Sequence, residues 1–165
     1  GKSSLERNQM KEKKAILIYM TVLAMFVMYV VLRTREYNTV HSIDITDYLV
    51  NENACYEIEE MRETEKALFL SGYFYWYGDV ERPINSSLAL LDLETGIVYE
   101  IPTQLSERED KEEKYSPISH FGFFGRINKR QVDLEHKKYQ LCYLDRGVNT
   151  KGVLTHMEIY VGKDS

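Results

Sequence analysis

The sequence lacks the short motifs that mark most catalytic and metal sites. Two cysteines and four histidines are spread over 165 residues, and none stands at a metal-ligand spacing such as Cys-x-x-Cys or His-x-x-x-His. It contains no Gly-x-Ser-x-Gly motif, no phosphate-binding loop and no dinucleotide fingerprint. We therefore expect a non-catalytic protein that uses no cofactor and no metal ion. An enzyme whose active site is spread over loops remains a weaker alternative.

Basic residues are in the minority outside the first 35 residues. Residues 1–35 hold seven Lys/Arg and two Asp/Glu, a net charge of +5. Residues 36–165 hold fourteen Lys/Arg and twenty-four Asp/Glu, a net charge of −10. Binding to nucleic acid depends on clustered Lys/Arg that neutralise phosphates. The acidic part of the chain therefore argues against nucleic acid as a partner.

Charge, proline and glycine are all missing from Ala15 to Leu32. Helical residues rise about 1.5 Å each, so this stretch reaches the hydrocarbon thickness of a bilayer. A buried core helix would show a polar face, and this stretch has none. A cleaved signal peptide would end in a small-x-small site, whereas Leu32 runs directly into Arg33. We expect a transmembrane helix over residues 15–33, which places the protein in the lipid bilayer.

The orientation of this helix follows from its flanks. Five Lys/Arg lie within residues 1–14, and two follow the apolar stretch closely. Basic segments are retained on the cytoplasmic side, so we expect a cytoplasmic tail over residues 1–14 and an extracytoplasmic domain at the plasma membrane. Thr21, Ala24 and Met28 form a stripe at helical spacing that suits docking on another helix. A lipid-facing stripe is the open alternative.

The rest of the chain predicts an all-β domain. Residues 34–62 mix polar groups with short apolar pairs and are interpreted as a tether, followed by a β domain over residues 63–165. Gly72 predicts a bulge or a close backbone approach, and Gly96 the positive φ of a hairpin loop. Short strands without long helices fit an antiparallel β-sandwich. The expected strands cover residues 67–77, 87–91, 96–101, 118–127, 138–144 and 154–161.

The densest aromatic block lies in the first of these strands. Successive strand residues point to opposite faces, so Phe74 and Trp76 oppose Tyr73, Tyr75 and Tyr77. One set belongs in the core, and the other is open to stack on sugar rings or contact a partner. Tyr75, Trp76 and Tyr77 are therefore the candidate contact residues, with packing inside the domain as the alternative.

Cys55 and Cys142 are the only cysteines. An extracytoplasmic location permits a disulfide between them. Two separate thiols packed as small apolar groups are the alternative.

Several short pieces of the β domain follow one another in a recognisable order. They are Leu68-Phe69-Leu70-Ser71-Gly72-Tyr73, Leu88-Ala89-Leu90-Leu91 ending in Val98-Tyr99, Arg108-Glu109-Asp110, the Phe121-Gly122-Phe123 turn into Ile127, and Tyr139-Gln140-Leu141. This order resembles the small β-sandwich domains that accompany bacterial cell-surface glycosyltransferases and polysaccharide synthases. Tyr73 departs from the pattern of these domains, in which Trp is common at that place. The resemblance transfers no catalytic residue.

The resemblance implies an accessory subunit of a membrane-embedded cell-envelope polysaccharide synthase or exporter. The partner would be a multi-pass membrane synthase or transporter, with the helix docked on it and the β domain near the polymer exit. The alternative is a membrane-anchored surface module that binds carbohydrate, such as a surface polysaccharide, or another protein.

Overall fold

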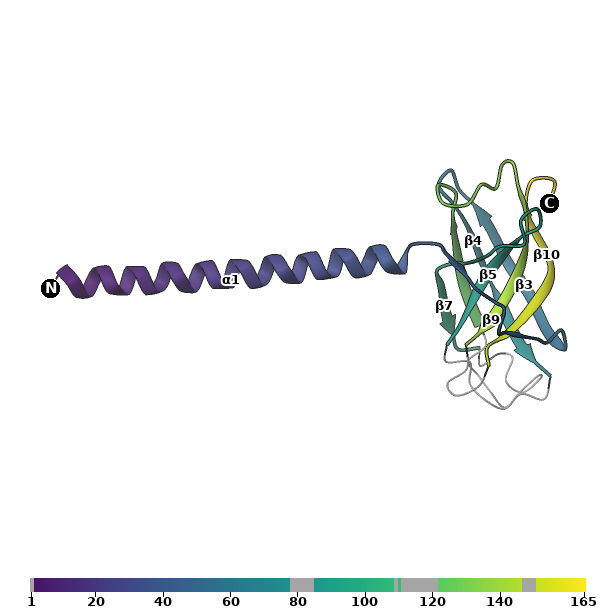
Figure 1. Ribbon diagram of the computed structural model, residues 1–165, viewed down its shortest axis with the longest axis horizontal. Coiled ribbons are helices and arrows are strands. Elements are labelled where there is room, and N and C mark those ends of the chain that lie inside the picture. Colours follow the sequence, from purple (N-terminus) through teal and green to yellow (C-terminus); the bar gives the residue numbers. More distant parts are fainter. Residues whose placement is uncertain (1, 78–84, 109, 111–121, 147–150) are drawn as a thin grey trace. The chain divides into compact units, whose positions relative to one another are not determined.

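The chain forms two separate units. The computed structural model describes residues 2–77, 85–108, 110, 122–146 and 151–165, and the side chains of this set except those of residues 2–9, 36 and 37. Gly1–Asn38 form one unit and Thr39–Ser165 the other. Figure 1 shows the first as a continuous helix and the second as a group of strands.

The first unit is a single helix, α1, from Lys2 to Tyr37. Its segment Met10–Arg35 is long and apolar enough to cross a membrane, and none of its most apolar window is buried. Its threonine hydroxyl groups bond inside the helix: Thr21 donates to the Leu17 carbonyl (2.9 Å) and Thr34 to the Val30 carbonyl (2.8 Å). The predicted span 15–33 lies within this helix, which extends further toward the N-terminus than the apolar residues do.

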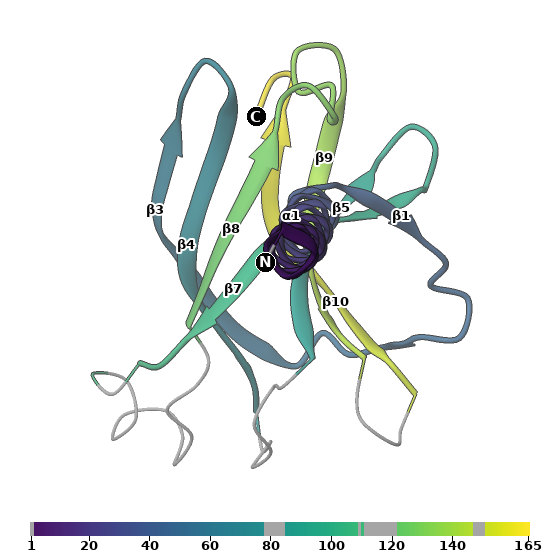
Figure 2. The same ribbon diagram turned by 90° about the vertical axis from the view of Figure 1, so that its left-hand side faces the viewer.

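The second unit consists of two sheets, so the expected β-rich class is confirmed. Neighbouring strands are antiparallel except for one parallel pair, β10 and β2. The six-stranded sheet has the order β1 (His41–Ile43), β6 (Val98–Glu100), β5 (Ser86–Asp92), β9 (Lys138–Asp145), β10 (Val153–Gly162), β2 (Leu49–Val50). The four-stranded sheet has the order β3 (Ala54–Glu63), β4 (Ala67–Trp76), β8 (Gly122–Asn128), β7 (Thr103–Ser106). In Figure 2, β3, β4 and β8 run side by side.

One hydrophobic core contains residues of both sheets. Phe74 of β4 stacks on Tyr143 of β9 with ring centroids 3.8 Å apart, and Trp76 meets Tyr143 edge-on at 5.6 Å. Alternation in β10 holds as predicted for Met157 and Val161, which lie in this core. Strand residues with period two therefore supply the buried face of each sheet.

The interpretation of residues 34–62 as a tether is wrong for most of that range. Strands β1 and β2 lie at opposite edges of the six-stranded sheet, so the chain between them crosses its outer face. Ile43, Ile45 and Tyr48 of this crossing segment, which we call the strap, pack on a second cluster. That cluster comprises Ala89, Val98, Cys142, Leu144 and Leu154. A few apolar residues at irregular spacing suffice to cover a sheet face, and they give no periodic signal.

Residues 54–63 also belong to the sheet, as edge strand β3. Its charged residues Glu57, Glu60 and Arg62 face away from the core, whereas Tyr56 and Ile58 pack against it. Charge on an edge strand protects its open backbone from pairing with other chains. The same charges obscured the strand in the sequence.

Both glycine predictions are confirmed. Gly96 has φ of 73° in the loop between β5 and β6. At Gly72 an added Cβ would overlap the backbone carbonyl of Glu57 in β3, and the register of β3 shifts between Ile58 and Glu60. The close approach and the bulge therefore occur together, with the bulge in the neighbouring strand.

The loop that contains Gly96 is organised by the buried carboxylate of Asp92. Its Oδ1 accepts hydrogen bonds from the backbone N–H of Glu94 (2.9 Å) and Thr95 (3.2 Å), and its Oδ2 lies 2.7 Å from Lys137 Nζ. Burial by itself would raise the pKa of Asp92, but the hydrogen bonds from Lys137 and the loop outweigh it and lower that pKa. The loop is thus held by a charged group.

The expected strand 118–127 is described only from Gly122 onward, where β8 runs to Asn128. Residues 118–121 lie outside the described residues. The remaining predicted strands coincide with β4, β5, β6, β9 and β10 to within a few residues.

Candidate functional site

The outer face of the four-stranded sheet carries a group of aromatic and basic side chains. Register places Phe69 opposite Arg126 and Ser71 opposite Phe124 on neighbouring strands β4 and β8. The alternate residues Leu68, Leu70 and Ile127 lie in the core. Phe69, Phe124 and Arg126 must therefore point away from it, because opposed residues share a face.

Two rings and two guanidinium groups meet on this face. Phe69 and Phe124 stack with centroids 5.9 Å apart and planes inclined by 27°. The guanidinium carbon of Arg62 lies 5.0 Å from the Phe69 centroid, and that of Arg126 lies 5.9 Å from it. Phe124 is 41% exposed. We call Arg62, Phe69, Phe124 and Arg126 the platform.

A third arginine crosses the same face but is fully engaged. Arg108, just beyond β7, bonds both oxygens of the Glu59 carboxylate and both of Asp110, with three of the four contacts at 2.8–2.9 Å. It also lies over the Tyr73 ring (5.8 Å). The hydrogen bonds to Asp110, which have the largest effect, and those to Glu59 raise the pKa of Arg108 above its usual value. Gly122 makes this path available, because a Cβ there would lie 2.7 Å from Arg108 Cγ.

The guanidinium groups of the platform differ from Arg108 in having no carboxylate. Within the described part of the chain, neither Arg62 nor Arg126 forms an ion pair, whereas Arg108, Lys129 and Arg146 each do. Both arginines are exposed. The platform thus combines exposed ring surface with two guanidinium groups that form no ion pair with a described carboxylate.

The predicted contact residues Tyr75, Trp76 and Tyr77 are divided by the sheet. Trp76 is only 7% exposed and its Nε1–H donates to Thr155 Oγ1 (2.8 Å), so its assignment as a glycan or partner contact is corrected. Tyr75 is half-buried and Tyr77 is 56% exposed, with centroids 5.7 Å apart. Tyr75 shares the outer face of β4 with the platform, and Tyr77 follows directly after the end of this strand.

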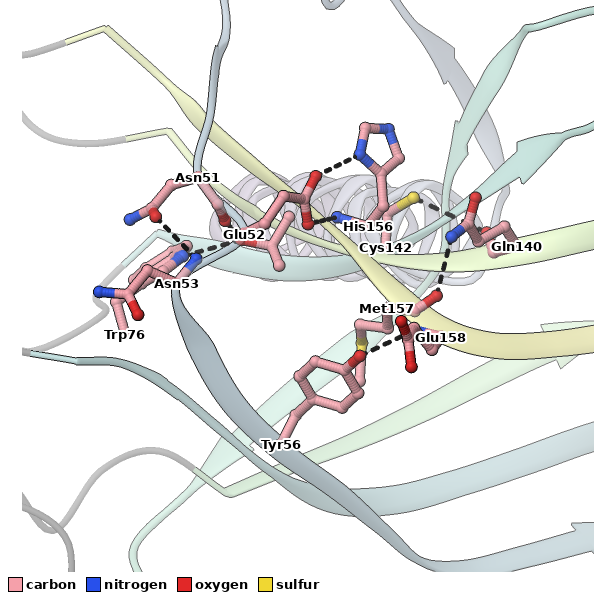
Figure 3. A network of polar contacts seen from close by, with 11 residues as sticks. Asn51, Glu52, Asn53, Tyr56, Trp76, Gln140, Cys142, His156, Met157 and Glu158 are labelled. Atoms are coloured by element: carbon pink, nitrogen blue, oxygen red, sulfur yellow. Dashed lines mark hydrogen bonds and ion pairs between the residues drawn. The ribbon is translucent and has the colours of Figure 1, made fainter.

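Figure 3 shows a polar network that joins the two sheets beside the bulge of β10. The Tyr56 hydroxyl accepts from the Glu158 backbone N–H (2.8 Å), and Gln140 Nε2 donates to the Met157 carbonyl (3.0 Å). The register of β10 shifts between His156 and Tyr160, which removes these backbone groups from regular strand pairing. Side chains satisfy them instead, as buried backbone polar groups require.

The same network holds the start of β3 against β10. His156 Nδ1 lies 2.7 Å from Glu52 Oε1, and the His156 backbone N–H donates to the other oxygen of that carboxylate (3.2 Å). The Thr155 hydroxyl donates to the Asn51 carbonyl while accepting from Trp76. These contacts fix the position of the strap's end and of the four-stranded sheet. Their geometry is that of a structural joint.

The two cysteines are free thiols, so the disulfide alternative is not formed. Cys55 lies in β3 and Cys142 in β9, which belong to different sheets. Cys142 points to the face covered by the strap. Burial raises the pKa of its thiol to about 12. Cys142 therefore behaves as a small apolar group rather than as a nucleophile.

The predicted docking stripe and the metal sites complete the comparison with the sequence. Thr21, Ala24 and Met28 are exposed along α1, and the hydrogen bond that Thr21 donates runs to the helix's own backbone. Among the described residues, no group of three or more His, Cys, Asp and Glu side chains is placed to hold a metal ion.

Sequence reasoning missed the platform. Its members come from three strands, and none of them was predicted to be a contact residue. Phe69 and Phe124 stood inside expected strands, but their shared face depended on register. Comparison of the chain with protein-family models, with curated proteins and with solved structures gives no match, so the geometry itself carries the functional argument.

Proposed function

We propose that this protein is a non-catalytic, single-pass accessory subunit of a membrane-embedded cell-envelope polysaccharide synthase or exporter. Residues 15–33 lie in the bilayer, residues 1–14 in the cytoplasm, and the β unit, a β-sandwich, outside the plasma membrane. The exposed apolar surface of α1 carries the proposal, and the resemblance to domains of glycan machinery gives its direction.

The energetics of α1 favour lipid. Fifteen large apolar side chains between Ile16 and Leu32 are each at least 44% exposed in the helical unit. Moving one such side chain out of water contributes ~1.5–3 kcal/mol. The helix satisfies its own backbone hydrogen bonds, so it enters hydrocarbon without leaving polar groups unpaired. The basic residues before the apolar stretch favour a cytoplasmic N-terminus.

The docking of α1 on a partner is assigned to Thr21, Ala24 and Met28. Small side chains let helices approach closely in a membrane, where packing replaces the hydrophobic effect as the driving force. Phe26 and Val30 lie on the opposite side of the helix, because residues are spaced by 100°.

Co-purification tests the proposal. The tagged full-length chain, solubilised in mild detergent, is expected to bring down a multi-pass membrane protein of glycan synthesis or export. Ala24→Leu fills the docking stripe and is expected to weaken recovery of that partner, whereas Val30→Phe, an enlargement of similar size on the other side, leaves it unchanged. Recovery of no multi-pass partner refutes the subunit role.

A second candidate, a membrane-anchored surface module, is favoured by the platform. Open rings beside unpaired arginines form a binding surface that a purely structural subunit does not need. The two candidates differ in whether the full-length chain co-purifies with a multi-pass membrane protein, because a surface module needs no such partner.

A further inference from the structure

The strongest unexplained feature of the β unit is the pair of positive charges on the platform. Arg62 and Arg126 flank the ring of Phe69 from the two neighbouring strands. Among the described residues of this acidic domain, Arg108, Lys129 and Arg146 each have a carboxylate partner, whereas Arg62 and Arg126 lie over an aromatic ring instead. Two guanidinium groups on one face that form no ion pair favour binding of an anion.

The ring beside them is open. Phe124 is 41% exposed, and the residues directly opposite it on the neighbouring strands are the small Ser71 and the exposed Gln104. Neither Ser71 nor Gln104 has an apolar side chain large enough to cover the Phe124 ring. Phe124 therefore presents apolar ring surface within reach of the Arg126 side chain, two residues along the same face of β8.

The sheet restricts which molecules fit here. Strands β4 and β8, which carry Phe69, Phe124 and Arg126, are inner strands whose backbones pair on both sides, so a peptide lying over them has no open ladder to extend. A ligand that lies over these two strands therefore meets side chains. A stable protein interface buries roughly 800 Å² on each partner, and the platform consists of four side chains. A ligand of smaller footprint that is both apolar on one face and anionic fits better.

An acidic sugar has both properties. We propose that the platform binds an acidic polysaccharide of the uronic-acid type, with a sugar ring stacked on Phe124 and its carboxylate bonded to Arg126 and Arg62. Planar guanidinium groups pair with carboxylates through two parallel hydrogen bonds. This inference rests on the proposed function and deepens it, because it names the chemical class of the polymer that the outer domain meets.

Binding to defined glycans tests the inference. The full-length chain in nanodiscs of zwitterionic lipid is immobilised, and binding of oligogalacturonate is measured by biolayer interferometry beside neutral maltooligosaccharide of equal length. Selective binding of oligogalacturonate that weakens with ionic strength is expected. Arg62→Gln and Arg126→Gln are each expected to lower affinity about tenfold or more, since each removes charge-assisted hydrogen bonds.

Matched controls separate the site from general surface effects. Phe124→Ala is expected to lower affinity, whereas Tyr160→Ala, which removes a ring of 43% exposure beside Lys138 in the other sheet, is not. Arg130→Gln removes an exposed arginine outside the platform and is also expected to be neutral. Melting curves of all variants identify any that fail to fold, and the two glutamine variants, at exposed positions, keep the test decisive.

The results that overturn the inference are distinct from those that refute the subunit role. Equal binding of neutral maltooligosaccharide, equal binding of poly-glutamate, no binding of oligogalacturonate, or binding that both glutamine variants retain would each overturn it. Phe124→Ala and Arg126→Gln leave α1 intact and are expected to co-purify with the membrane partner as wild type does. Lost co-purification with glycan binding intact instead counts against the subunit role alone.

Discussion

Replacing Trp76 tests the division of the aromatic block into core and outer face. Trp76 is 7% exposed, contacts Phe74 and Tyr143 edge-on at 4.9 and 5.6 Å, and donates a hydrogen bond to Thr155. Truncating a buried Trp to Ala costs about 3–5 kcal/mol. A domain of this size loses roughly 3–6 °C of melting temperature per kcal/mol. We therefore expect Trp76→Ala to lower the melting temperature by more than about 10 °C.

Two further variants resolve the contributions of the ring and of its N–H group. Trp76→Phe keeps an aromatic ring but removes the donor, and is expected to cost about 1–3 kcal/mol from the lost hydrogen bond and the smaller ring. Tyr77→Ala, at an exposed position, is expected to change the free energy of unfolding by less than about 1 kcal/mol. Differential scanning fluorimetry and urea unfolding measure these differences.

The expected binding result is equally specific. Trp76→Phe, which stays folded, is expected to retain oligogalacturonate binding, because the ring lies on the opposite side of the sheet from the platform. A Trp76→Ala variant that melts like wild type would refute the burial argument, as would a folded Trp76→Phe variant that has lost glycan binding.

The remaining predictions concern the backbone, a thiol and a carboxylate. Gly72→Ala is expected to lower the free energy of unfolding in urea by about 3 kcal/mol, because the added Cβ meets a backbone oxygen of β3. Gly96→Ala has open space around the added Cβ but a φ of 73°, and is expected to lower it by about 1 kcal/mol. A larger loss for Gly96→Ala than for Gly72→Ala would contradict the geometry. Native-state thiol labelling at neutral pH is expected to modify Cys55 before the buried Cys142, and preferential labelling of Cys142 would show that the strap opens. Asp92→Asn is expected to destabilise the fold by about 1–2 kcal/mol at neutral pH. A carboxyl group whose pKa is lowered in the folded state stabilises the fold at pH values above its ordinary pKa, and this contribution is lost as the pH falls through the folded-state pKa. The difference between variant and wild type is therefore expected to disappear as the pH falls below about 4, and a pH-independent difference would contradict the argument.

Local patterns in the sequence were enough for the helix and most strands. The uncharged run from Ala15 to Leu32 forms part of one helix because it contains no Pro or Gly that would interrupt helical hydrogen bonding. Strands β4, β9 and β10 were found because β-branched and aromatic residues were dense or alternated with period two. Gly96 was found because a tight loop needs positive φ.

The binding face required information about register. Alternation showed that Trp76 and Tyr77 point to opposite sides of β4, but only the second sheet, through Phe74 and Tyr143, decided that Trp76 is the buried one. Phe69 and Phe124 are far apart in sequence and meet because β4 and β8 pair in one particular register. A shift by one residue would send one of them into the core.

The sequence by itself determined the helix, the strands with dense or alternating apolar residues, the places where charge is concentrated and the suitability of the helix for a membrane, since these depend on neighbours along the chain. Tertiary structure alone decided that residues 43–48 form a strap and that Arg108 crosses the sheet to Glu59. It also placed Arg62 and Arg126 on either side of Phe69, where neither forms an ion pair with a described carboxylate. Each of these outcomes depends on contacts between distant segments, and such contacts form only when the sheets assemble.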